Sequence, residues 1–202
     1  AGPMLPLAFF RDRTFSAASL VGLLINIAFY GLIFDLSLYF QQIRGYTPAD
    51  DRVGVCADDR DRAGGQYLRR PGSGSDRRTA PMVAGQAILA IGCFFLLVAI
   101  SVNTPYRDLW WQMVMLGAGI GLTVPPMTSA LLATVDRSQS GVASGVLNTT
   151  RQVGSVIGVA LFGSLIANRD HFVTGVHLAL YASIALLVIG IVAALAAVRE
   201  PA

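Results

Sequence analysis

An arginine lies near the middle of a long apolar run. Residues 140–167 are predominantly apolar, and Arg151 follows about eleven residues after their start. A helix rises about 1.5 Å per residue, so Arg151 would lie roughly 16 Å deep, near the middle of a bilayer. A charge at that depth is costly, and it marks either a functional pathway or a structural pairing between helices or with backbone carbonyls. We favour a pathway through the membrane, and we expect the polar face of 140–167 to turn into the bundle because lipid would penalise Arg151.

Polar and small residues accompany this arginine. Asn148 and Ser155 stand three residues before and four residues after Arg151, so a helix places all three on one face, with Gln152 on the adjacent edge. Glycines four residues apart allow helices to approach closely. Three such pairs are predicted packing positions: Gly117 and Gly121, Gly141 and Gly145, and Gly154 and Gly158.

Two further polar residues lie in the first apolar run. Asp35 is a candidate proton site, because a carboxylate in apolar surroundings can hold a proton at working pH. It also lies five residues from the end of its run, and we favour a simple position near the membrane interface. Asn26 lies nearer mid-span, where a contact with substrate and a hydrogen bond between helices are equally good interpretations.

The elements that would position these residues are membrane-spanning helices. Five apolar runs, each long enough for the about 20 residues that a bilayer requires, indicate an all-α membrane protein of five to six transmembrane helices. The composition agrees, with 54% hydrophobic and 13% charged residues among 202. The runs cover roughly 15–40, 82–102, 109–135, 140–167 and 173–198.

The sequence does not support an enzyme, a metal or cofactor protein, or a nucleic-acid-binding protein. It contains no Walker A loop, no GxSxG or HExxH motif and no metal-ligand spacing, so we predict no enzyme, cofactor or metal site. The net charge is +3, and all fifteen basic residues are arginine. No basic stripe with interleaved aromatic residues indicates a nucleic-acid partner.

Residues 51–80 interrupt the pattern where another span is expected. They contain seven Arg and five Asp and almost no apolar periodicity. This composition predicts a loosely ordered loop, because each charge would cost about 2.5–3.5 kcal/mol at a helix centre.

Two stretches of the sequence resemble a known family. PMLPLAFFRDRTFSAASLVGLLINIAFYGLIF, with LSLYFQQIRGYTPAD after Asp35, resembles the ninth span of fourteen-span drug:proton antiporters of the major facilitator superfamily (the EmrB/QacA type). PPMTSALLATVDRSQSGVASGVLNTTRQVGSVIGVALFGSLIA resembles their twelfth and thirteenth spans. The usual residue at Asp35 in that family is aliphatic.

The resemblance implies that residues 1–202 form the C-terminal six-helix half of a transporter, which is one half of a major-facilitator-type bundle. Its expected role is proton-coupled export of drugs or small metabolites by alternating access, and its expected location is a bacterial inner membrane. Its partners would be lipid, substrate, protons and the N-terminal half. The alternative is a non-transporting membrane fragment or a pseudogene product.

The resemblance stops after Asp50 and resumes near Pro81 without a change in length, which predicts a frame-shifted tenth span over 51–80. Codons permitted for 51–78, read one base later, give the apolar stretch TGLAFAPMTAIVLAANIFAGRV. A sequencing error and a true pseudogene are both compatible with this pattern.

The arginines outside the apolar runs also fit six crossings, with both termini cytoplasmic. One side would carry Arg11, Arg13, Arg77, Arg78, Arg137 and Arg199, and the other Arg44, Arg107 and Arg169.

Overall fold

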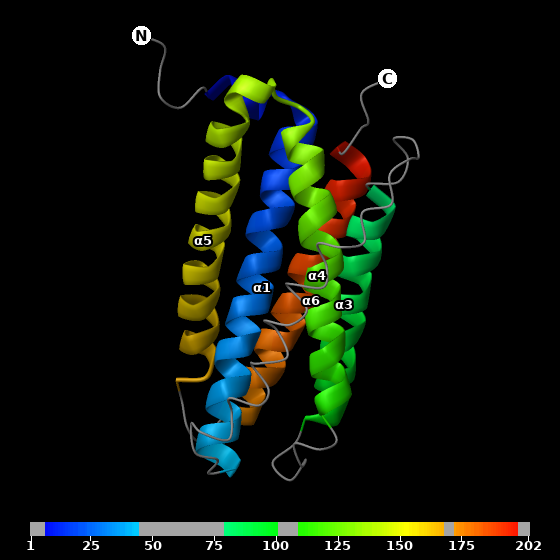
Figure 1. Ribbon diagram of the computed structural model, residues 1–202. Coiled ribbons are helices and arrows are strands. Elements are labelled where there is room, and N and C mark those ends of the chain that lie inside the picture. The colour runs from blue at the N-terminus through cyan, green and yellow to red at the C-terminus, as the bar shows by residue number, and fades with distance from the viewer. Residues whose placement is uncertain (1–6, 45–78, 101–108, 168–171, 198–202) are drawn as a thin grey trace.

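Five long helices make up the part of the chain that the structure describes. The computed structural model describes residues 7–44, 79–100, 109–167 and 172–197 (Figure 1). The predicted apolar runs correspond to these helices within a few residues. The elements are η1 (Leu7–Arg11), α1 (Arg13–Arg44), α3 (Thr79–Ala99), α4 (Trp110–Leu132), η4 (Arg137–Gln139), α5 (Ser140–Leu165) and α6 (Phe172–Ala197).

Helix α1 is the central helix of the bundle. Asp12 caps its first turn, where the backbone N–H of Phe15 donates to the Asp12 carboxylate at 2.9 Å. Of the residues in its most apolar stretch, 72% are buried, against 33–39% in α3, α4 and α6. Helices α5, α6 and α4 all pack against α1, and α5 does so most extensively.

The members of two apolar core clusters show in which direction each helix runs. The upper cluster joins the beginnings of α1, α3 and α5 to the ends of α4 and α6, as Phe15, Met82, Met127, Ala143 and Ala194 show. The lower cluster joins the opposite ends of the same helices. Helices α1, α3 and α5 therefore run in one direction and α4 and α6 in the other (Figure 1).

The outside of the bundle is largely apolar. Four of the described helices, α1, α3, α4 and α6, are long and apolar enough to cross a membrane. Helix α5 has a similar length, but its polar residues lower its mean hydropathy and it is not among the four. Exposed valine, leucine, isoleucine and aromatic side chains cover α3, α4 and α6, as a lipid-facing surface requires.

The predicted loop at 51–80 lies almost entirely outside the described residues, which resume at Thr79. The structure therefore does not test the frame-shift hypothesis directly. The arginines that can be compared agree with the expected orientation: Arg11, Arg13 and Arg137 are exposed and lie at the upper end, near the start of α1 and between α4 and α5.

A candidate transport pathway on α5

Arg151 of α5 lies where α1, α4 and α5 meet. Its aliphatic stem packs over Gly22 of α1, where an added Cβ would lie 3.4 Å from the Arg151 Cγ. The same position would lie 3.2 Å from a methyl group of Leu147 and 3.4 Å from the sulfur of Met127 in α4. Because Gly22 has no side chain, the long side chain of Arg151 can pack over it, where it lies half-buried.

The guanidinium of Arg151 is incompletely satisfied. Its Nε is buried and has no hydrogen-bond partner in the described part of the chain. A buried donor of a charged group is expensive without a partner. Asp35, the buried carboxylate of α1, cannot supply it from its present position. Asp35 lies thirteen residues beyond Gly22, or about 20 Å along the helix.

The polar residues beside Arg151 form a strip along α5. Asn148 and Gln152 are exposed, and Ser155 is half-buried with its hydroxyl donating to the Gln152 carbonyl at 2.8 Å. We expected the polar face of 140–167 to turn into the bundle. Within the described residues only the Arg151 stem does so, and Asn148 and Gln152 point away from the helices of this chain. We call Asn148, Arg151, Gln152 and Ser155 the polar strip.

Asn26 is close to Arg151 but does not join the polar strip. It is 2% exposed, and its amide nitrogen donates to the Gly22 carbonyl at 2.7 Å. Its Cβ lies 3.2 Å from the place that a Cβ would take at Gly154. Asn26 is therefore enclosed between α1 and α5 and satisfied by its own helix, which fits a structural role better than contact with a substrate.

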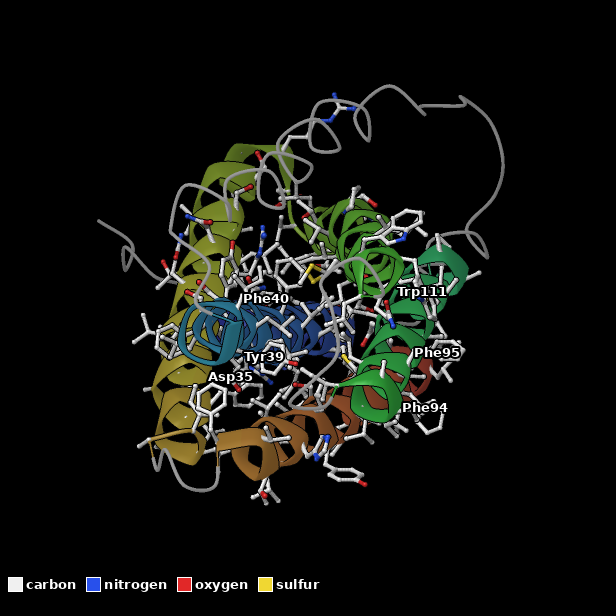
Figure 2. All side chains as sticks on the ribbon, turned by 90° about the horizontal axis from the view of Figure 1, so that it is seen from below. Asp35, Tyr39, Phe40, Phe94, Phe95 and Trp111 are labelled. Carbon is white, nitrogen blue, oxygen red and sulfur yellow. The ribbon has the colours of Figure 1, made fainter. Side chains whose placement is uncertain are left out.

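Asp35 is buried inside the bundle. It is 0% exposed, and neither carboxylate oxygen has a hydrogen-bond partner among the described residues. Figure 2 shows it on the side of α1 that faces α5 and α6, near Tyr39 at the lower end of the bundle. An ionised carboxylate in such surroundings is costly unless a proton or a cation neutralises it. Burial inside the bundle is separate from depth in the membrane, so the position near the interface that we favoured stays a prediction.

The six predicted packing glycines separate into two groups. Gly154 and Gly158 lie directly against α1, where an added Cβ at Gly154 would come within 2.6 Å of the Leu23 carbonyl oxygen and one at Gly158 would overlap the Ile27 carbonyl oxygen. In contrast, nothing described lies within 4 Å of a Cβ added at the other four, Gly117, Gly121, Gly141 and Gly145. Those four do not pack between helices of the described chain.

Sequence reasoning missed a close contact of α3 with α4. A Cβ added at Gly85 would lie 2.7 Å from the Gly119 carbonyl oxygen, and one at Gly119 would lie 2.8 Å from the Gly85 carbonyl oxygen. Neither glycine has a second glycine four residues away, so the GxxxG pattern could not identify it. Gly22, which admits Arg151, was missed for the same reason.

Comparison with known proteins agrees with this architecture. The sequence pattern described as Major Facilitator Superfamily matches residues 70–202. The chain is 34% identical over 180 residues to the methylenomycin A resistance protein of Streptomyces coelicolor, covering 84% of this chain and 36% of that protein. It is 30% identical over 164 residues to the methylenomycin A resistance protein of Bacillus subtilis, covering 81% and 35%.

A third relative is the multidrug resistance protein Stp of Mycobacterium tuberculosis, 27% identical over 167 residues, covering 83% of this chain and 31% of that protein. The chain therefore spans about a third of the length of these relatives. The match and the apolar helices identify an integral membrane protein. The chain belongs to the major facilitator superfamily.

Proposed function

We propose that this chain is the C-terminal six-helix half of a fourteen-span drug:proton antiporter in a bacterial inner membrane. The observation that carries the proposal is the polar strip, with Arg151 at mid-helix, on a face of α5 that no described helix covers. In an apolar bundle such a face requires either water or a second protein surface. A second six-helix half, facing the strip across a cavity, would supply both.

The proposed mechanism is alternating access. Two six-helix halves would rock about a site near the middle of the membrane and open it to each side in turn. The pathway on this half would be lined by Arg151, Asn148, Gln152 and Ser155. Asn26, enclosed between α1 and α5, would support the position of Arg151. The names of the relatives, which describe resistance to methylenomycin A and to multiple drugs, favour small organic molecules as the exported class.

Asp35 is the proposed proton-carrying group of this half. The support is its burial without a described partner, since a carboxylate there is stable only when neutralised. A residue that exchanges a proton as the helices move would couple export to proton entry. Its distance of about 20 Å from the Arg151 neighbourhood means that this coupling would pass through α1 rather than through direct contact.

A second candidate is a non-transporting membrane fragment or pseudogene product. The observation that favours it is the run of seven Arg and five Asp in 51–80, where a span is needed. A gain-of-function experiment separates the two candidates. The chain, with the shifted reading restored in that region, would be produced together with an N-terminal half in cells that lack other exporters, and efflux of a fluorescent hydrophobic cation would be recorded.

Efflux that needs both halves and stops when the proton gradient is collapsed supports the antiporter. Efflux that survives collapse of the gradient contradicts proton coupling. Absence of efflux, with both halves present in the membrane in normal amounts, favours the non-transporting fragment.

A further inference from the structure

The polar strip of α5 presents more hydrogen-bond donors than acceptors. The Arg151 guanidinium makes no hydrogen bond or ion pair with any described residue, and its Nε is buried. The side-chain amides of Asn148 and Gln152 have no described partner either. The hydroxyl of Ser155 already donates to the Gln152 carbonyl. A guanidinium carries five N–H donors and no acceptor, so the strip favours a ligand rich in acceptor atoms.

No described carboxylate neutralises Arg151. The acidic residues in the described part of the chain are Asp12, Asp35 and Asp136. Gly22 is the residue of α1 beside Arg151. Asp12 and Asp35 stand ten and thirteen residues from it, or about 15 and 20 Å along the helix. Asp136 precedes α5, fifteen residues before Arg151. Among the described residues, therefore, the charge of Arg151 has no counter-ion.

The depth of Arg151 argues against a lipid headgroup as that counter-ion. Arg151 follows eleven residues after the start of α5, or roughly 16 Å along it. The hydrocarbon core is about 30 Å thick, so both headgroup layers lie about 15 Å from its middle. The stem of Arg151 packs over Gly22, within the bundle, which keeps the guanidinium far from either layer. The counter-ion must instead enter the middle of the membrane.

The surface along the polar strip suits an organic molecule better than a small inorganic ion. Gly145 and Val156 lie on the same side of α5 as Asn148 and Gln152, at spacings of three or four residues. Nothing described lies within 4 Å of a Cβ added at Gly145, and Val156 is 69% exposed. The strip therefore has open space toward the start of α5 and an apolar side chain toward its end.

We propose that the polar strip is an anion subsite, in which Arg151 binds the carboxylate of an amphiphilic organic cargo. This inference rests on the proposed function and deepens it by naming the charge of the exported molecule. A planar guanidinium donates two parallel hydrogen bonds to a carboxylate, and the amide of Asn148, on the same face, supplies a further donor. A phosphate monoester carries between one and two charges at neutral pH, so a single guanidinium matches a carboxylate better.

Binding of two matched probes tests the subsite on the chain itself. The probes are naphthoic acid, which is anionic, and naphthamide, which has a similar shape without the charge. Equilibrium dialysis with the purified chain in non-ionic detergent would give both affinities. The carboxylate should bind about tenfold or more weakly to Arg151→Gln than to the parent chain, and the amide equally to both. All other arginines are the same in the two proteins, so the difference reports Arg151 alone.

Asn148→Asp is a second variant, which keeps Arg151 in place. Asn148 is exposed, and its new carboxylate would pair with the guanidinium three residues later and compete with the probe. The matched control is Thr149→Asp, which adds the same charge at the next exposed position, where the side chain does not face Arg151. Carboxylate binding should fall several-fold in Asn148→Asp and stay close to that of the parent in Thr149→Asp.

Equal affinity of the parent chain and Arg151→Gln for the carboxylate would overturn the proposal. Equal effects of Asn148→Asp and Thr149→Asp would also overturn it, because the probe would then respond to net charge and not to a site. Carboxylate binding should persist when the chain, with the shifted reading restored, is assembled with an N-terminal half. Its loss on assembly would assign Arg151 to a carboxylate of that half and reject the cargo subsite.

Export separates the subsite from the proposed function. In the assembled transporter, efflux of the carboxylate would be compared with efflux of its amide and of a hydrophobic cation. Preferred efflux of the carboxylate, weakened in Asn148→Asp, supports both proposals. Preferred efflux of the cation would overturn the anion subsite and leave a transporter. Carboxylate binding without efflux of any of the probes would reject the proposed function and leave the subsite intact.

Discussion

The packing of α5 on α1 gives the most quantitative prediction. In Gly158→Ala the added Cβ would overlap the Ile27 carbonyl oxygen and lie 2.9 Å from the Ile27 Cα. Carbon atoms prefer separations of about 3.5–4.0 Å, so α5 must move away by roughly 0.5–1 Å. The obstacle is backbone, which cannot rotate aside as a side chain can. Overpacking of this kind typically costs about 1–3 kcal/mol.

The matched variant is Gly145→Ala, in the same helix but with nothing described within 4 Å of its added Cβ. Both substitutions gain the same helix propensity, about 1 kcal/mol, so their difference isolates the steric term. We expect Gly158→Ala to be less stable than Gly145→Ala by about 1–3 kcal/mol, or roughly 5- to 150-fold in the unfolding equilibrium constant. The assay is unfolding by SDS in mild detergent micelles, followed by circular dichroism.

Equal stability of the two variants would refute the reasoning, because it would mean that α5 does not lie on the α1 backbone as described. A Gly145→Ala variant that is the less stable of the two would place the packed face on the opposite side of α5. The polar strip would then be turned toward α1, and the candidate pathway would have to be reassigned.

Three further predictions concern other parts of the bundle. Gly119→Val should lower the SDS concentration at which half of the protein is unfolded, because its side chain meets the Gly85 carbonyl. Gly117→Val has open space around it and should leave this midpoint unchanged. Equal midpoints of the two variants would contradict the α3–α4 contact. Asp35→Asn should leave the folded protein at least as stable, because a buried carboxylate is removed, yet abolish proton-driven export; normal export with an intact proton requirement would exclude Asp35 as the proton carrier. Trp110 and Trp111, which are 57% and 36% exposed and are the two tryptophans of the chain, should be quenched more strongly by lipids brominated near the headgroup than by those brominated near the chain end; the reverse order would place the lower end of α4 deep in the membrane.

The helices could be predicted from sequence because lipid imposes a simple rule. A segment of about 20 apolar residues has one stable conformation in a bilayer, so apolar runs translate directly into helices. The prediction of Gly154 and Gly158 as packing positions, and of Arg151 as a special residue, depended on local spacing in the same way. These features lie within one helix, where sequence distance and spatial distance are related.

Contacts between helices were harder to predict because they depend on which helices become neighbours. Four glycines with the same spacing as Gly154 and Gly158 make no contact in the described chain, while Gly85 and Gly119 meet without that spacing. Asp35 was placed by its distance from the end of an apolar run, and that distance does not reveal whether α5 and α6 enclose it. Its burial follows from the central position of α1, which no pattern within the first run could indicate.

Residues 51–80 illustrate both the local patterns and the arrangement of helices. Sequence alone showed a charged stretch at the place of a span, and codon compatibility showed what a shifted frame could encode. The structure adds that α1 and α3 run in the same direction. Determining the DNA sequence across this region in an independent isolate would test the frame shift itself.

The most direct test of the proposed function is drug efflux by an Arg151 variant. In a full-length transporter that carries this chain as its C-terminal half, with the shifted reading of 51–78 restored, efflux of a fluorescent substrate would be compared between the parent protein, Arg151→Ala and Arg151→Lys. The control is Thr149→Val, an exposed position on α5 outside the polar strip. All variants would be normalised to the amount of protein in the membrane.

Arg151→Ala should abolish or strongly reduce efflux with normal membrane levels, since removal of a mid-membrane charge lowers the cost of insertion. Arg151→Lys should retain part of the activity if charge matters more than the planar set of donors. Thr149→Val should export normally. Normal efflux by Arg151→Ala would contradict the proposed pathway, and loss of that variant from the membrane would instead assign Arg151 to packing or pairing between helices.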